Sequence, residues 1–192
     1  MRKERTQVVI VGGGPVGMAL AIDLAQRGIS STVVERRTEP HRIPKGQGLT
    51  QRSMEHLYAW GVADQVRAAR LLPRGFTMSG VTAYRDLMSQ YWAAPRVREL
   101  VNAYYFQSNE RLPQYLTEQV LRDRMSDFSD IDVRTGWSAA RIEQDDQSVR
   151  VGIVEEGGSV RDVLEGDYVV GCDGSHSTVR EQVAALRILT SS

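Results

Sequence analysis

A glycine-rich turn after an apolar strand is the feature that most constrains this chain. Residues 7–17 read QVVIVGGGPVG, so a run of apolar β-forming residues leads directly into a run of glycines. The spacing of Gly12, Gly14 and Gly17 matches the G-x-G-x-x-G turn that joins a strand to a helix. Such a turn is weak evidence in isolation, because glycines gather in many turns. Its meaning depends on the elements around it.

The elements that follow the turn complete a nucleotide-binding unit. Apolar residues at helical spacing run to Gly28, a second apolar strand covers residues 31–34, and Glu35 ends that strand. This order predicts an α/β fold, a Rossmann-like domain with a parallel sheet. Glu35 lies 18 residues after Gly17, where a carboxylate accepts hydrogen bonds from both hydroxyls of an adenosine ribose and disfavours a 2′-phosphate. The unit therefore predicts FAD or NAD as the ligand in preference to NADP.

Each residue type in the turn has a physical role if the ligand is a dinucleotide. Gly12 permits the tight turn, Gly14 lets the backbone approach a pyrophosphate, and Gly17 lets the helix pack closely against the strand. Pro15 belongs to the same turn, and the backbone N–H groups near Val16 and Gly17 have no partner inside the helix. The positive end of the helix dipole lies behind these N–H groups, so they attract phosphate.

Composition excludes several classes of function. The 192-residue chain is 41% apolar and 25% charged with a formal net charge of zero, which gives no electrostatic case for nucleic acid or an anionic membrane. Cys172 is the single cysteine, so neither an internal disulfide nor a cysteine metal cluster is expected. His41, His56 and His176 lack the spacing of metal ligands on one helix. We therefore expect no nucleic-acid partner and no metal.

A cytoplasmic protein without a membrane span is expected. The basic residues at the start of the chain, followed by an apolar stretch, resemble a signal peptide only superficially. Glycines and Pro15 interrupt the apolar run, and Asp23 lies within the predicted helix. No apolar run approaches the length of a membrane-spanning helix.

The rest of the chain alternates helices with strands and contains an aromatic-rich insertion. We expect a long loop over 36–48, a helix that Thr50 caps and Gly61 breaks, and a short helix over 63–69. Further along we expect antiparallel strands within 76–92 and 100–107, a helix over 116–125, a strand of the parallel sheet over 131–133, an antiparallel meander over 140–144, 149–155 and 160–164, a strand over 168–172 and a short helix from Ser177.

With these elements in place, the chain resembles a known family through stretches that occur in the family's order. These are VVIVGGGPVGMALAIDLAQRG with its following acid, PKGQGLTQRSMEHLYAWGV, LPQYLTEQVLRD and DYVVGCDGSHSTVR. They resemble the single-component FAD-dependent aromatic hydroxylases, flavoprotein monooxygenases that include para-hydroxybenzoate and phenol hydroxylases. The pattern DGxxSxVR in the last stretch is far more specific than the glycine turn.

The resemblance implies the fold and its division into domains. A glutathione-reductase-like FAD-binding domain is expected over 1–75 and 108–192, with the start of a β-rich substrate domain inserted over 76–107. The family's downstream segments, which bind the flavin ribityl chain and cover its ring, have no counterpart in residues 181–192. We therefore expect an N-terminal portion of a longer hydroxylase, with an FAD-binding domain that is incomplete at its C-terminus.

The resemblance also implies which residues bind FAD. The expected contacts are Gly12, Gly14, Pro15, Val16, Gly17, Glu35, Arg36, Lys45, Gln114 and Asp173. The glycine turn would hold the pyrophosphate, Glu35 the adenosine ribose, and Arg36 would lie by the adenine. Lys45 would offset phosphate charge, although it lacks the planar fork of the arginine found in many family members. Gln114 would contact the ribityl or ring region of the flavin.

Other assignments compete with simpler interpretations. By resemblance Asp173, with Arg180 beside it, would lie near the pyrophosphate and organise the approach of the nicotinamide nucleotide. An Asp-Gly pair at a strand end is also a good turn and helix cap. The catalytic residues are unknown. Tyr105, Gln107 and Arg111 are candidates for activating the substrate, and exposed loop and sheet positions are the simpler interpretation of each.

The function implied is hydroxylation of a small, phenol-like aromatic substrate by O₂, with FAD as cofactor and NADH or NADPH as electron donor. A different-class alternative is a non-catalytic flavin- or nucleotide-binding module, or a truncated product. An NAD-dependent dehydrogenase is a third alternative, which the meander and the Asp-Gly stretch disfavour. The sequence leaves the choice between NADH and NADPH, the substrate and the oligomeric state open, and a homodimer is one option.

Overall fold

The computed structural model describes residues 4–43, 45–73, 82–83, 88, 92–93, 102–158 and 161–183. The chain divides into two compact units, one formed by Met1–Pro44 with Gln114–Ser192 and the other by Lys45–Pro113. The domain boundaries expected at residues 75 and 108 stay a prediction, because most of the expected insertion lies outside the described residues.

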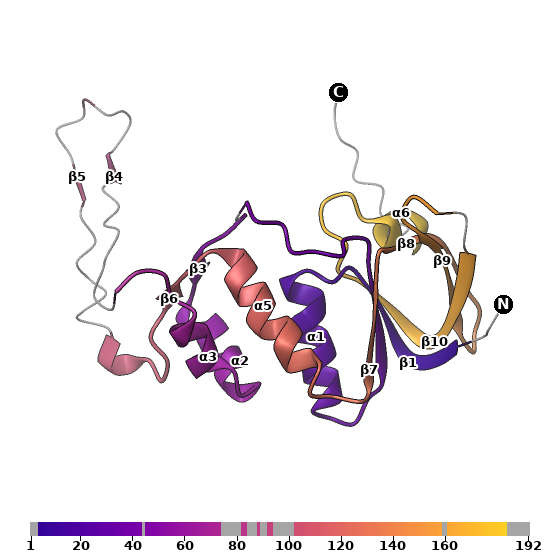
Figure 1. Ribbon diagram of the computed structural model, residues 1–192, viewed down its shortest axis with the longest axis horizontal. Coiled ribbons are helices and arrows are strands. Elements are labelled where there is room, and N and C mark those ends of the chain that lie inside the picture. Colours follow the sequence, from indigo (N-terminus) through magenta and orange to yellow (C-terminus); the bar gives the residue numbers. More distant parts are fainter. Residues whose placement is uncertain are drawn as a thin grey trace. The chain divides into compact units, whose positions relative to one another are not determined.

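The first unit is built on a mixed sheet. Among the described residues this sheet has six strands in the order β7-β2-β1-β10-β9-β8 (Figure 1). Their bounds are β1 Glu4–Val11, β2 Ser31–Glu35, β7 Ile131–Thr135, β8 Trp137–Gln144, β9 Val149–Glu155 and β10 Arg161–Gly171. Strands β7, β2, β1 and β10 are parallel, whereas β9 and β8 continue the sheet in antiparallel pairing. The predicted α/β fold with a parallel sheet and an antiparallel meander is confirmed.

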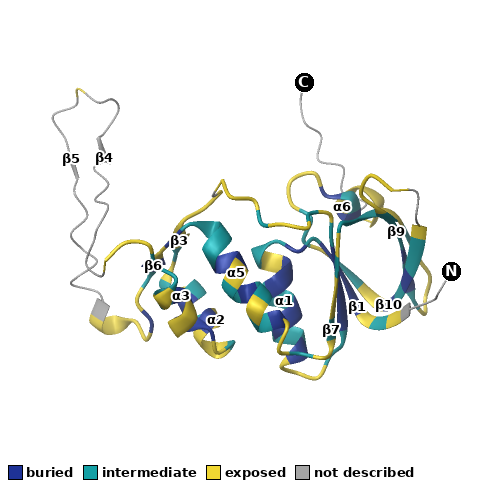
Figure 2. Ribbon diagram, viewed as in Figure 1, coloured by how far each residue is buried: buried dark blue, intermediate teal, exposed yellow. Residues whose placement is uncertain are grey.

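Helices of the first unit cover this sheet and form a core with it. Helix α1 (Pro15–Ala25) packs against α5 (Gln114–Met125), as Figure 1 shows, and the short helix α6 is Thr178–Val183. The side chains of Val9, Ile10, Met18, Ile22 and Val33 are fully buried. In Figure 2 the dark blue of buried residues marks parts of α1 and β1. A continuous apolar run such as that of β1 is typical of a parallel strand covered on both faces.

One part of the meander differs from the prediction. The strands expected over 160–164 and 168–172 are a single strand, β10, which pairs antiparallel with β9 and parallel with β1. The intervening Glu-Gly-Asp resembles a turn, yet a Cβ on Gly166 would lie 3.1 Å from a methyl group of Val9, so this glycine permits close approach to β1. Both flanking acids form ion pairs with Arg5. The distance is 3.2 Å for Glu165 and 2.7 Å for Asp167. Polar residues that resemble a turn therefore lie within a strand.

The second unit contains short elements. These are β3 Gly48–Leu49, α2 Gln51–Ala59, α3 Ala63–Ala68, β4 Thr82–Ala83, β5 Trp92–Ala93, the 3₁₀ helix η1 Asn102–Tyr104 and β6 Glu110–Arg111. The predicted helix start is confirmed, because the Thr50 hydroxyl accepts a hydrogen bond from the Ser53 N–H at 3.2 Å. Gly61, with φ of +78°, follows the end of α2 as predicted. Strand β3 pairs with β6, and β4 with β5, both antiparallel. The strand expected over 100–107 is wrong where the structure describes it, because residues 102–104 form η1 and residues 105–107 belong to no strand. Most of the positions expected to be strands within 76–92 lie outside the described residues.

No helix among the described residues combines the length and the apolar character needed to cross a membrane.

Candidate functional site

Apart from Gln114, the predicted site residues of the first unit gather at one edge of its sheet. Strands β1, β2, β7 and β10 run parallel, so their carboxyl ends lie at the same edge. Val11 is the register partner of both Val34 and Gly171, and Glu35 is the partner of Thr135. The glycine turn, the end of β2 and the Asp173 loop therefore leave the sheet together. In open α/β sheets this edge is where ligands bind.

Two glycines of the turn are required by the chain itself. Gly12 has φ of +106°, and a Cβ added to it would lie 2.4 Å from the carbonyl oxygen of Cys172. A Cβ on Gly17 would lie 1.9 Å from the carbonyl oxygen of Gly12. Neither position accepts a side chain without movement of the backbone. Both roles match the prediction of a tight turn and close helix packing.

Gly14 differs from both, because nothing in the described part of the chain requires it to be glycine. Its backbone is extended (φ −75°, ψ −177°), a conformation that any residue adopts, and it is the N-cap of α1. A Cβ added there would have no heavy atom within 4 Å. Pro15 begins the helix, and the side chain of Val16 is 70% exposed. The backbone at the start of α1 thus borders open space, which fits the pyrophosphate of a dinucleotide.

Glu35 connects the glycine turn to the loop after β2. Its Oε2 accepts a hydrogen bond from the Gly13 N–H at 2.7 Å, and its Oε1 accepts one from the Arg37 N–H at 2.9 Å. A Cβ on Gly13 would lie 2.7 Å from the Cβ of Glu35, so this contact requires glycine at position 13. The sequence reasoning missed Gly13, although the triple glycine was the available signal. Each carboxylate oxygen retains a second lone pair that can accept from a ribose hydroxyl.

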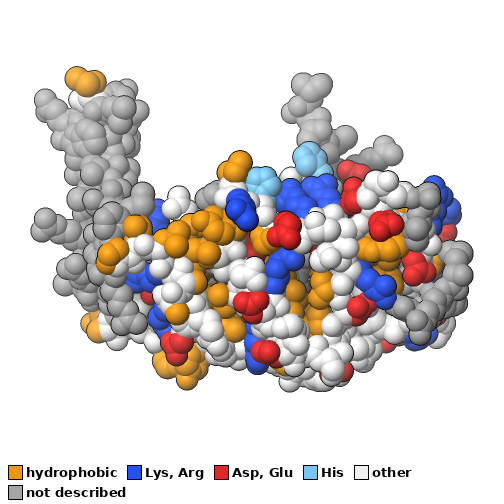
Figure 3. All heavy atoms as spheres, in the orientation of Figure 1, with side chains coloured by type: hydrophobic (Ala, Val, Ile, Leu, Met, Phe, Trp, Pro, Cys, Tyr) orange, Lys and Arg blue, Asp and Glu red, His pale blue; other side chains and the backbone are white. Residues whose placement is uncertain are grey.

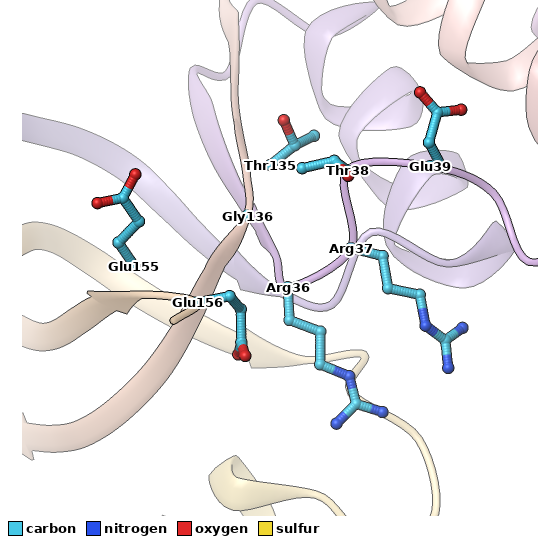
Figure 4. Close-up of a pocket in the computed structure, with 8 residues that line it drawn as sticks. All are labelled: Arg36, Arg37, Thr38, Glu39, Thr135, Gly136, Glu155 and Glu156. Carbon is cyan, nitrogen blue, oxygen red and sulfur yellow. The ribbon is translucent and has the colours of Figure 1, made fainter. Parts of the chain in front are cut away.

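The residues that directly follow Glu35 in the sequence line a pocket of about 490 Å³. It is lined by Arg36, Arg37, Thr38, Glu39, Thr135, Gly136, Glu155 and Glu156 (Figure 4). In Figure 4 the side chains of Arg36, Arg37 and Glu156 extend in the same general direction. The volume suits a small-molecule fragment, and the lining offers charges of both signs. The sequence reasoning found Arg36 here but missed the lining residues from the β7–β8 turn and the end of β9.

The carboxylate of Asp173 accepts hydrogen bonds from residues that follow it in the sequence. Its Oδ1 accepts from the Ser177 hydroxyl at 2.6 Å, and its Oδ2 accepts from the Val179 N–H at 3.3 Å. The Ser177 hydroxyl in turn accepts from the Arg180 N–H at 3.0 Å, which caps α6. The guanidinium of Arg180 donates to the carbonyl of Ser175 at 2.5 Å. This arrangement supports the interpretation as a turn and helix cap, and a cofactor contact for Asp173 stays a prediction.

Cys172, just before Asp173, is a free thiol with intermediate exposure. Burial raises the pKa of Cys172 above the usual value for a thiol, and the charge of Asp173 raises this pKa further. The neutral thiol, which is less reactive than the thiolate, is therefore favoured.

The other predicted residues have separate locations. Lys45 belongs to the second unit and is exposed, whereas Gln114 begins α5 of the first unit. Among the catalytic candidates, Tyr105 and Arg111 are exposed. Gln107 is buried, and its amide oxygen accepts a hydrogen bond from the guanidinium of Arg67.

Comparison with known proteins gives consistent matches along almost the whole chain. The model of the FAD-binding domain family matches residues 5–190. A rifampicin monooxygenase of Streptomyces venezuelae is 32% identical over 174 residues, which cover 91% of this chain and 33% of the relative. A 3-(3-hydroxy-phenyl)propionate/3-hydroxycinnamic acid hydroxylase of Burkholderia cenocepacia is 29% identical, over 94% of this chain and 32% of the relative. The chain thus spans about a third of the length of these relatives.

Solved structures give the same result. The flavin-dependent monooxygenase PieE, in complex with FAD and substrate, superposes with a TM-score of 0.82 at 26% identity, over 95% of this chain and 32% of that one. The rebeccamycin biosynthetic enzyme RebC with reduced flavin superposes with a TM-score of 0.77 at 28% identity, over 94% of this chain and 34% of that one.

Proposed function

The chain belongs to the FAD-binding domain family, and on that premise we propose that it binds FAD as part of a flavin-dependent aromatic monooxygenase. The family resemblance read from the sequence is thereby confirmed. The observation that carries the proposal is Gly14. No conformational or packing need of the described residues accounts for this glycine, and it opens the start of α1 to a ligand at the carboxyl edge of the sheet. A turn that binds a pyrophosphate needs a glycine here, because the backbone must come close to the phosphates.

The residues at this edge fit the adenosine diphosphate half of FAD. Gly14, Val16 and Gly17 would hold the pyrophosphate through the backbone at the start of α1. Glu35 would accept hydrogen bonds from the ribose, with its orientation already fixed by the backbone N–H of Gly13. Arg36 would lie by the adenine, since it lines the pocket next to Glu35.

The remaining predicted contacts belong to the same proposal. Pro15 would start the helix whose first N–H groups bind the phosphates, and Gly12 would shape the turn. Lys45 would offset phosphate charge, Gln114 would contact the flavin, and Asp173 would approach the pyrophosphate.

When bound, FAD supplies the redox chemistry, accepting reducing equivalents from NADH or NADPH and reacting with O₂. The contribution of this chain is to bind and orient the cofactor. A small aromatic, phenol-like substrate is proposed because relatives include a hydroxylase named for hydroxyphenyl acids. The similarity to PieE supports FAD as the cofactor, since that flavin-dependent monooxygenase is in complex with FAD and substrate.

A direct test is reconstitution of the purified chain with FAD. We expect a yellow chromophore that survives gel filtration, with quenched flavin fluorescence. Binding of NAD without FAD would instead indicate a dehydrogenase. Retained FAD without substrate-stimulated oxidation of NADH or NADPH, in the chain and in a version lengthened to the size of its relatives, would indicate a binding module.

A cytoplasmic location and assembly as a homodimer complete the proposal. The location follows from the need for NADH or NADPH as reductant. Light scattering of the FAD-loaded chain tests the dimer, and a monomer mass at working concentration contradicts it.

A further inference from the structure

Helix α5 carries a buried carboxylate one turn after Gln114. The side chain of Glu118 lies on the buried face of the helix, with 9% of the residue exposed. Its Oε1 accepts a hydrogen bond from the Nε2 of Gln114 at 2.7 Å. Within the described part of the chain, no arginine, lysine or histidine forms an ion pair with it. Arg122 follows one turn later on the same helix but lies beyond ion-pair distance. Burial of a carboxylate whose one hydrogen-bond partner among the described residues is an amide costs stability, so it needs another explanation.

The charge of Glu118 determines how the Gln114 amide is oriented. An ionised carboxylate has no proton to donate, so only the NH₂ group of Gln114 can face it. The amide oxygen of Gln114 must then face away from Glu118. Because Gln114 is itself half-buried at the first turn of α5, this oxygen is a pre-oriented hydrogen-bond acceptor.

The same helix contains a matched pair on its solvent side. The Nε2 of Gln119 donates to Oδ1 of Asp123 at 2.8 Å, and both residues are exposed. The residue types, the spacing of four and the hydrogen-bond length are nearly the same as for Gln114 and Glu118. Exposed pairs of this kind add little to helix stability. The Gln114–Glu118 pair therefore differs from the Gln119–Asp123 pair in its burial.

We propose that Glu118 is a positioning residue, which holds the Gln114 amide so that its oxygen accepts a hydrogen bond from the flavin nucleotide. The inference rests on the proposed function, because it requires that Gln114 contacts FAD. The donor on the cofactor is a ribityl hydroxyl or a ring N–H, the groups of the flavin that can face an acceptor oxygen. Glu118 itself does not touch the cofactor.

A double-mutant cycle on FAD affinity tests this role. The dissociation constant is measured by quenching of flavin fluorescence for the wild-type chain, Gln114→Ala, Glu118→Ala and the double variant. We expect each single variant to weaken binding about tenfold, the loss typical of one hydrogen bond to or through a charged group. The double variant should bind about as weakly as Gln114→Ala, because Glu118 acts only through Gln114. Asp123→Ala, the matched control, should bind FAD as the wild type does.

Several outcomes overturn the inference. Additive losses would mean that Glu118 acts independently of Gln114, and an unchanged affinity of Glu118→Ala would remove its role. If Glu118→Ala does not fold, as judged by circular dichroism, Glu118→Gln replaces it in the cycle with an expected loss of about threefold, because a neutral amide fixes the orientation less firmly. A wild-type chain that does not bind FAD overturns the proposed function as well. A wild-type chain that binds FAD, with an additive cycle, overturns this inference alone.

An exchange of the two side chains tests the direction of the amide. Gln114→Glu brings two carboxylates together and should weaken FAD binding by at least about tenfold. Adding Glu118→Gln restores a donor at position 118 and leaves a carboxylate oxygen at position 114 free to accept. Affinity should return to within about threefold of the wild type. If the exchange does not restore binding, Gln114 donates to the cofactor and the proposed orientation is wrong.

Discussion

At the level of single residues, the three glycines of one sequence motif differ in why glycine is needed at each position. Gly12 and Gly17 are fixed by contacts of 2.4 Å and 1.9 Å that a Cβ would make with the backbone, whereas a Cβ on Gly14 would contact none of the described residues. The first two positions therefore serve folding, and we propose that the third serves binding. Substitutions at these positions should separate the two properties.

We expect Gly14→Val to leave the fold intact and to abolish tight FAD binding. Valine at an N-cap costs about 1 kcal/mol relative to better caps, while its methyl groups occupy the space of the pyrophosphate. FAD affinity should fall by roughly 100-fold or more, equivalent to about 3 kcal/mol. Gly17→Ala, by contrast, should lower the free energy of unfolding by about 2–3 kcal/mol through overpacking. Urea denaturation and flavin fluorescence measure both; normal FAD affinity in Gly14→Val would refute the assignment.

The reactivity of Cys172 is a second prediction for a single residue. Burial and the charge of Asp173 raise the pKa of this thiol, so the reactive thiolate forms at higher pH in the folded chain than in the unfolded chain. Folding is therefore favoured below the pKa of the unfolded thiol, and this contribution is lost as the pH rises through the folded pKa. The rate of iodoacetamide labelling should reach half its maximum at a higher pH in buffer than in urea. Because the chain has one cysteine, mass spectrometry reports on this site directly. Equal midpoints would contradict the prediction.

At the level of elements, the sequence predicted most helices and strands but divided one strand in two. Local signals such as the Thr50 cap and the apolar run of β1 act within a few residues, and they were read correctly. Strand β10 was divided because Glu165, Gly166 and Asp167 have turn-forming character. Their actual role depends on β1, more than 150 positions earlier in the chain, where Arg5 pairs with both acids. Propensity cannot reveal such a contact.

A buried ion-pair cluster of the second unit gives a prediction at this scale. The carboxylate of Glu110 in β6 is 7% exposed and lies 3.0 Å from Arg70 and 3.8 Å from Arg67, both at or near the end of α3. Glu110→Gln leaves two partly buried guanidinium groups without their shared counter-charge, and should lower the free energy of unfolding by about 2–3 kcal/mol.

The control for this cluster is Asp64→Asn. Asp64 pairs with the same Arg67 at 3.0 Å, but its side chain is 95% exposed. Exposed pairs contribute little, so urea denaturation should detect no change. Equal destabilisation by the two substitutions would show that burial of Glu110 is not the cause.

At the scale of the whole molecule, the candidate site consists of segments that are distant in sequence. The turn at Gly12 and the acid at Glu35 were predicted together because a motif links their spacing, and the loop at Asp173 was predicted from the family resemblance. The pocket also uses Thr135 and Glu155, whose neighbours carry no such motif. They join the site because β7 pairs with β2 and the meander turns back beside it. Parallel pairing of β7 with β2 places Thr135 there, and antiparallel pairing of β9 with β8 places Glu155 there. No local pattern encodes either pairing.

This arrangement predicts which part of FAD the chain recognises. Apart from Gln114, the described site residues of the first unit gather where the turn, Glu35 and the pocket would meet the adenosine diphosphate half. ADP should therefore stabilise the chain much as FAD does, and FMN should not. At a ligand concentration 100 times the dissociation constant, binding adds about 2.7 kcal/mol, which raises the Tm of a chain of this size by roughly 5–10 °C. Thermal denaturation with each ligand measures this shift, and Gly14→Val should remove it for both FAD and ADP. Stabilisation by FMN but not by ADP would mean that the flavin end, rather than the glycine turn, dominates binding.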